Sequence, residues 1–113
     1  MSDIIYSGER ILYTRYNVVA GRRTNVYANG VPLVSYGLSK RGSLSLFDWG
    51  YVGVRPINLG ISLLIDYYQA SVDFRYCEKF TKDVISLLPD RWEFSSARID
   101  YYFEWLFEQE DNE

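Results

Sequence analysis

Short runs of apolar residues, separated by polar segments and glycines, occupy the first half of the chain, as they do in proteins built from β-strands. Residues 4–6 and 11–19 are rich in β-branched and aromatic residues, so each run is predicted to form a strand. Residues 20–23, Ala-Gly-Arg-Arg, are predicted to form a turn after the second run.

A hairpin is predicted around Asn29-Gly30, because both residue types tolerate the positive φ that a two-residue turn requires. The flanking runs, residues 25–28 and 31–36, are largely apolar and suit its two strands. Residues 44–49 form another short apolar run, which predicts one more strand.

Apolar residues recur every three or four positions in the second half, which is typical of helices. Pro56 suits the first position of a helix, where its missing N–H costs nothing. A second helix is predicted between a cap at Ser71 and a stop at Pro89. A third is predicted from the serine pair at 95–96 to about Phe107.

This order, strands first and helices afterwards, predicts an α+β fold. We expect an N-terminal antiparallel sheet of about four or five strands, followed by three helices packed on one face. A length of 113 residues suits one domain, which we place at residues 1–107. Residues 108–113 are predicted to be a frayed acidic tail.

The residue types that are missing exclude several kinds of chemistry. The chain has no histidine and one cysteine, Cys77. A structural zinc site and a nucleophile paired with histidine therefore cannot be built within one chain. We expect no metal, no cofactor and no catalytic residue set, so an enzyme is the less favoured class.

The net charge of −3 and the pI of about 4.9 argue against nucleic acid as the main partner. The only adjacent basic pairs are Arg22-Arg23 and Lys40-Arg41, both in predicted turns, and they are the candidate nucleic-acid contacts. The longest apolar stretch, residues 59–65, is too short to span a bilayer, and no secretory signal is visible. We expect a cytoplasmic protein without a membrane partner.

The segment from Trp49 to Pro56 joins the predicted strands to the first helix and admits two interpretations. Gly50 and Gly53, with Arg55 beside a helix N-terminus, are a candidate anion site for a phosphate or carboxylate. The simpler interpretation is that the glycines only turn the chain from strand to helix. Asp48 and Asp66, with Tyr51 and Arg55, are a weaker candidate for acid/base chemistry.

The same segment carries a resemblance. The sequence is similar to the domain of unknown function 6166 family through Trp49-Gly50-Tyr51-x-Gly53-x-x-Pro56, Phe80-x-x-Asp83-Val84-Ile85 and Tyr6-x-Gly8-x-Arg10. The resemblance implies a small stand-alone protein of bacteria, phages or viruses with no assigned activity. Family members often carry Asn-His-Ser-Pro before the central motif. Here residues 41–44 read Arg-Gly-Ser-Leu, so any chemistry of that histidine is lost.

The third predicted helix carries the candidate interface. Its main apolar face is Ile99, Tyr102, Phe103 and Leu106, whereas Tyr101 and Trp105 lie on an adjacent face. Apolar residues on two faces suggest an interface, and Tyr and Trp are common at binding hot spots. We therefore expect a small acidic, non-enzymatic accessory factor that binds a protein partner or itself as a homodimer. By analogy of size and charge alone, virus- or phage-encoded factors that act on host machinery are one class of this kind. The alternatives are a small-ligand binder or enzyme at the anion site and a nucleic-acid binder.

Overall fold

Two long strands dominate the computed structural model, which describes residues 3–37 and 46–111. Strand β1 (Ile5–Arg15) pairs antiparallel with β2 (Val18–Ala28) along its whole length. The chain reverses at Tyr16-Asn17, where both residues have positive φ. The predicted turn at residues 20–23 is wrong, because those residues lie inside β2. A tyrosine seldom adopts positive φ, so the real turn gives little sequence signal.

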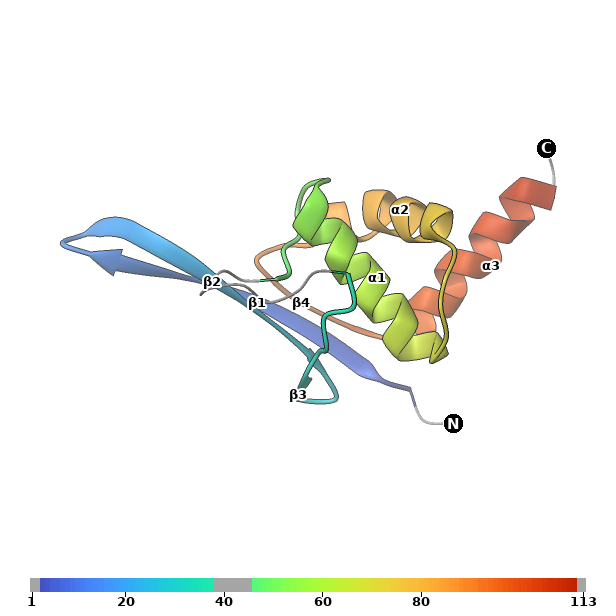
Figure 1. Cartoon of the computed structure of the whole chain (residues 1–113), viewed down its shortest axis with the longest axis horizontal. Coiled ribbons are helices and arrows are strands. Elements are labelled where there is room, and N and C mark those ends of the chain that lie inside the picture. The colour runs from blue at the N-terminus through green and yellow to red at the C-terminus, as the bar shows by residue number, and fades with distance from the viewer. Residues whose placement is uncertain (1–2, 38–45, 112–113) are drawn as a thin grey trace.

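Two short strands complete a four-stranded antiparallel sheet with the order β3-β2-β1-β4 (Figure 1). Strand β3 (Val31–Pro32) follows the Asn29-Gly30 turn, as the sequence predicts. Strand β4 (Arg91–Ser95) pairs with the first five residues of β1. The fourth strand therefore comes from the segment before the last helix, where the sequence predicts only a short extended connection at residues 92–94.

The prediction of a strand at residues 44–49 is wrong for residues 46–49, which are the part that the structure describes. Residues 44 and 45 lie outside the described residues, and residues 46–49 form no strand. Their carbonyl groups bond to side chains instead: Thr24 donates to the carbonyl of Phe47, and the Asn58 amide donates to that of Leu46. Side-chain donors thus replace a strand ladder, and the apolar side chains pack into the core.

Three helices account for most of the second half. Helix α1 (Val54–Tyr68) begins two residues before Pro56. Helix α2 (Phe74–Asp83) is capped by Asp73, not by Ser71, and ends in a short 3₁₀ turn, η1 (Ile85–Leu87). Helix α3 (Ala97–Asp111) continues beyond Phe107 into the predicted tail. The α+β fold class is confirmed.

The core lies between one face of the sheet and the helices. The sheet contributes Tyr6, Val26, Trp92 and Phe94, which are all at most 8% exposed. Leu59, Leu63 and Leu64 of α1, Phe80 of α2 and Ile99 of α3 are completely buried opposite them. Where β4 pairs with β1, the other face of the sheet carries the polar residues Ser7, Glu9, Arg91 and Glu93.

The molecule is elongated, with extents of 55 × 30 × 24 Å. The β1–β2 turn projects from one end, and the C-terminal half of α3 lies at the other (Figure 1). These two ends carry the surfaces described next.

Candidate protein-binding surfaces

A buried carboxylate, Asp48, ties the base of the long hairpin to the body. Its side chain is 2% exposed and lies 2.8 Å from the Arg10 guanidinium and 2.6 Å from that of Arg22. The hydroxyl of Tyr51 also donates to it, at 2.9 Å. Arg10 comes from β1 and Arg22 from β2, so one carboxylate holds both strands. We call Asp48, Arg10, Arg22 and Tyr51 the Asp48 cluster.

The electrostatics of the cluster favour the ionised carboxylate. Burial alone would raise the pKa of Asp48, but hydrogen bonds from Arg10, Tyr51 and the Trp49 N–H outweigh it and hold the pKa below its ordinary value. Burial and the Asp48 carboxylate raise the pKa of Tyr51. An acid whose pKa is lowered by ion pairing stays charged at neutral pH, so the cluster is suited to structure and not to proton transfer.

The segment after Asp48 is also held by structural contacts. Arg10 donates to the Trp49 carbonyl at 2.6 Å and lies over the Trp49 ring. The Trp49 indole donates to the Pro89 carbonyl at 2.7 Å, and the Gly50 N–H donates to the Ile85 carbonyl at 3.1 Å. Gly50 has φ +86°, which only glycine adopts without strain. These contacts support the simpler interpretation of this segment, a joint between sheet and helices.

Beyond the Asp48 cluster, the hairpin leaves the body. Strand β4 pairs with β1 only as far as Glu9, and β3 pairs only with Tyr27 and Ala28 of β2. Within the part of the chain that is described, residues 11–15 and 18–23 therefore pair only with each other and have no third strand beside them. We call residues 11–23 the hairpin arm. Every residue from 11 to 20 is exposed, which means that neither face of the arm is covered.

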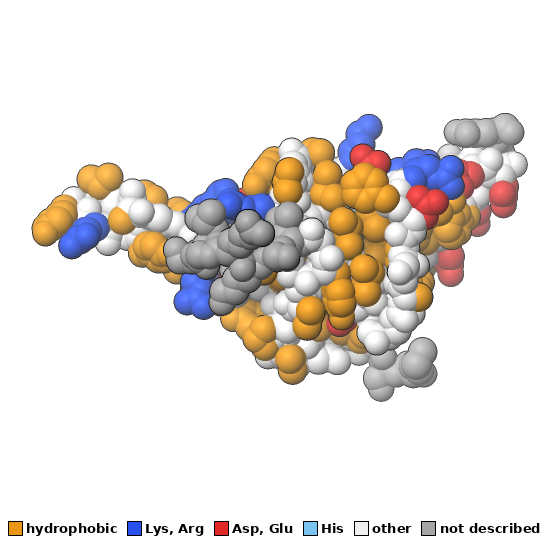
Figure 2. Space-filling model, in the orientation of Figure 1, with side chains coloured by type: hydrophobic (Ala, Val, Ile, Leu, Met, Phe, Trp, Pro, Cys, Tyr) orange, Lys and Arg blue, Asp and Glu red, His pale blue; other side chains and the backbone are white. Residues whose placement is uncertain are grey.

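The exposed residues of the arm are unusually apolar. Exposed fractions reach 90% at Tyr16 and 67% at Val18, and Figure 2 shows hydrophobic side chains along the projecting arm. The other large apolar residues exposed here are Ile11, Leu12, Tyr13 and Val19. A two-stranded hairpin is marginally stable alone in water, and exposed apolar patches mark interaction sites.

The charge of the arm has one sign. Residues 11–23 contain Arg15, Arg22 and Arg23 and no acidic residue. Arg22 is engaged by Asp48, whereas no described carboxylate lies within ion-pair distance of Arg15 or Arg23. The arm is therefore both apolar and basic, although the whole chain is acidic.

Helix α3 presents the opposite combination at the other end. Tyr101 is 72% exposed and Trp105 is 50% exposed, and they lie four residues apart on one face. Glu104 and Glu108 lie beside them, exposed and without a basic partner among the described residues. The helix has five acidic residues and one arginine, and acidic side chains gather at this end in Figure 2. We call Tyr101, Glu104, Trp105 and Glu108 the α3 face.

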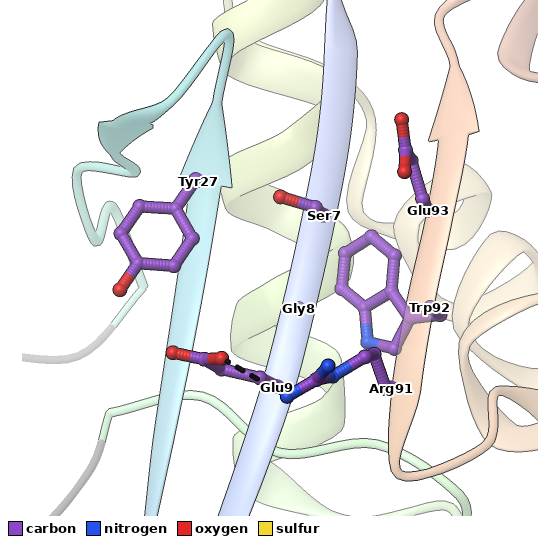
Figure 3. A pocket seen from close by; sticks show the side chains of 7 residues that line it. All are labelled: Ser7, Gly8, Glu9, Tyr27, Arg91, Trp92 and Glu93. Carbon is purple, nitrogen blue, oxygen red and sulfur yellow. Dashed lines mark ion pairs between the residues drawn. The ribbon is translucent and has the colours of Figure 1, made fainter.

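A shallow groove of about 420 Å³ lies on the sheet (Figure 3). Ser7, Gly8, Glu9, Tyr27, Arg91, Trp92 and Glu93 line it. The Arg91 guanidinium lies 3.7 Å from the Glu9 carboxylate, and its side chain is 83% exposed. Arg91 and Glu9 are thus accessible to solvent and close to each other, so the groove is a polar surface and not an enclosed reaction site.

The structure brings together some of the predicted site residues and separates others. Asp66 bonds to the Tyr6 hydroxyl, at 2.7 Å, and is not part of the Asp48 cluster. Arg22 and Arg23 lie on opposite faces of β2, so they do not act as one basic pair in a turn. Lys40 and Arg41 lie outside the described residues.

The anion site at Gly50, Gly53 and Arg55 stays a prediction. Helix α1 begins after Gly53, with no side-chain cap and no acidic residue in its first turn. Arg55 is half-buried and has no ion pair with any residue that the structure describes. The N–H of Gly50 already bonds to Ile85, which leaves this glycine without a donor for an anion.

The sequence pattern reveals neither the arm nor the role of Arg10, because the turn predicted at residues 20–23 interrupts the second strand. The signal that could have found the arm is the equal length of the two runs on either side of Tyr16-Asn17, eleven residues each, with Glu9 as their only acidic residue. No local signal pairs Arg10 with Asp48, because 38 residues separate them.

A family model described as a family of unknown function (DUF6166) matches residues 6–105, and the chain therefore belongs to this family. No curated protein and no solved structure matches the chain. Within residues 3–37 and 46–111, no group of three or more His, Cys, Asp or Glu residues is placed to hold a metal ion. None of the described helices is both long enough and apolar enough to cross a membrane.

Proposed function

We propose that the protein is a non-enzymatic protein-binding module whose recognition surfaces are the hairpin arm and the α3 face. The observation that carries this proposal is the arm: two paired strands that leave the body and expose apolar side chains on both faces. Burial of an exposed valine or leucine gains roughly 1.5–3 kcal/mol, so a partner that covers the arm would gain substantial free energy.

Rigid anchoring at its base supports the same proposal. The Asp48 cluster fixes both strands at the base of the arm, through Arg10 of β1 and Arg22 of β2. An anchored arm loses less conformational entropy on binding than a flexible loop does. The edges of the arm also carry unpaired backbone groups, to which a partner strand can add.

The test compares two valine pairs of matched exposure. Val18 and Val19 of the arm are 67% and 59% exposed, and Val31 and Val34, outside the arm, are 64% and 58% exposed. Valine to threonine keeps the β-branched shape and replaces one methyl group by a hydroxyl group, so the side chain becomes less apolar. The wild type and both double variants are immobilised, and the proteins retained from a lysate are compared by mass spectrometry.

We expect the Val18→Thr/Val19→Thr variant to lose the retained proteins, and the Val31→Thr/Val34→Thr control to keep them. Circular dichroism must show that both variants are folded. If the same proteins bind equally to all three chains, the arm is not the recognition surface and the proposal fails.

A further inference from the structure

We propose that the hairpin arm of one copy of this chain docks on the α3 face of a second copy, and that two copies exchange this contact reciprocally. The inference rests on the proposed function, because it names a partner for the same two surfaces. The charge, length and position of the two surfaces support it.

Charge decides what can cover the arm. Residues 11–23 carry three arginines and no acid, so two arms side by side would bring only like charges together. The arm needs a surface that is both apolar and acidic. The α3 face is such a surface, because Tyr101 and Trp105 lie beside the exposed carboxylates of Glu104 and Glu108, which have no basic partner among the described residues.

The arm is long enough to cover the α3 face. The five residues 11–15 of β1 extend about 17 Å at about 3.3 Å per residue. The seven-residue step from Tyr101 to Glu108 in α3 covers about 10 Å at about 1.5 Å per residue. An arm laid along the helix can therefore contact the whole α3 face.

The positions of the two surfaces require that the arm and the α3 face in contact belong to different copies. The arm and the C-terminal half of α3 lie at opposite ends of a molecule 55 Å long (Figure 1). An arm cannot reach the α3 face of its own chain. When two copies lie side by side and antiparallel, the arm of each copy lies at the α3 face of the other. This two-fold arrangement forms a closed dimer in which both arms and both α3 faces are buried.

The test reverses charge on each surface in the full-length chain. The arm-reversed variant carries Arg15→Glu and Arg23→Glu, and the helix-reversed variant carries Glu104→Lys and Glu108→Lys. A control with Arg75→Glu and Arg91→Glu has the same charge change as the first, at exposed positions outside both surfaces. Sedimentation equilibrium measures the dimer dissociation constant, and circular dichroism checks folding.

We expect the wild type and the control to dimerise equally, and each reversed variant alone to dimerise at least about tenfold more weakly. An equimolar mixture of the two reversed variants should recover wild-type affinity, because both contacts in the mixed dimer again join opposite charges. The arm-reversed variant mixed with wild type should not recover it, because one contact then joins two acidic surfaces.

Three results would overturn the inference. The wild type could be monomeric at every concentration, or the mixture of the two reversed variants could dimerise no more tightly than either variant alone. The third is that the arm-reversed variant mixed with wild type dimerises with full wild-type affinity. The last result would indicate contact between arms. If the wild type is monomeric while the Val18→Thr/Val19→Thr variant still loses proteins retained from a lysate, self-association fails and the proposed function stands.

Discussion

Replacing Asp48 by asparagine should strongly destabilise the fold, because Arg10 then loses its buried counter-charge and keeps only the exposed one, Asp90. The Asp48 side chain is 2% exposed, and that of Arg10 is 14% exposed. Breaking a buried ion pair by removing one partner costs about 3–5 kcal/mol. For a domain of this size, that loss lowers the melting temperature by roughly 10–20 °C.

The matched control is Asp90→Asn. Asp90 bonds to the same guanidinium of Arg10, but its side chain is 76% exposed. Exposed ion pairs contribute about 0–1 kcal/mol, so this variant should stay within about 1 kcal/mol of wild type. The comparison thus holds the partner constant and changes the burial of the carboxylate.

Urea unfolding followed by tryptophan fluorescence measures both variants, since Trp49 is buried next to Asp48. Circular dichroism, as a second probe, checks that unfolding is two-state. If Asp48→Asn costs less than about 1 kcal/mol, or no more than Asp90→Asn, the claim that a buried ion pair anchors the arm is refuted.

The same carboxylate gives a pH dependence of known sign. The pKa of Asp48 in the folded protein lies below its ordinary value of 3.8. The unfolded state therefore binds the proton more readily, and stability falls as pH drops through 3.8 towards the folded pKa. Asp48→Asn should lose less stability than wild type between neutral pH and about pH 3. Equal losses in urea titrations across this range would contradict the assignment.

Three further predictions follow from close packing and burial. Gly8→Ala should cost about 1–3 kcal/mol in urea unfolding, because the new methyl group would lie 2.4 Å from the Trp92 ring; an unchanged midpoint would show that the ring moves freely. Gly50→Ala should lower the free energy of unfolding by about 1–2 kcal/mol, since φ there is +86°, and a thermal melt that matches wild type would contradict the strain. Cys77 is 1% exposed and burial raises its pKa to about 11, so a thiol reagent at neutral pH should react only with unfolded protein; rapid labelling of the native state would refute this.

The fold class was predictable because helix and strand periodicities differ and Asn29-Gly30 specifies its turn. The long hairpin was not, because its turn uses Tyr16-Asn17, and the interior of β2 contains Gly21. The Tyr13 ring lies over this glycine, where an added Cβ would come within 2.8 Å, so the glycine serves packing and not a turn. A glycine followed by two arginines resembles a turn in sequence, and only the pairing of β2 with β1 shows that these residues lie inside a strand.

Some residues of the candidate surfaces were likewise predictable from the sequence and others were not. Tyr101 and Trp105 were predictable, because a helical repeat places them off the main apolar face, and both are exposed in the structure. The Asp48 cluster was not, because it joins residues far apart in the sequence: Asp48 is 38 positions from Arg10. A single sequence gives no sign of such a long-range ion pair, whereas it does show local amphipathic patterns.

The contact between the arm and the α3 face can be tested most directly by site-specific crosslinking. Cysteine is introduced at Val19 of the arm in one chain and at Tyr101 of α3 in another, and a short bismaleimide is added at neutral pH. The native Cys77 is buried and does not compete. We predict that the mixture of Val19→Cys and Tyr101→Cys chains gives a crosslinked heterodimer, and that each chain alone gives little product. Crosslinking of Val19→Cys chains to one another, or no product in the mixture, would contradict the proposed contact.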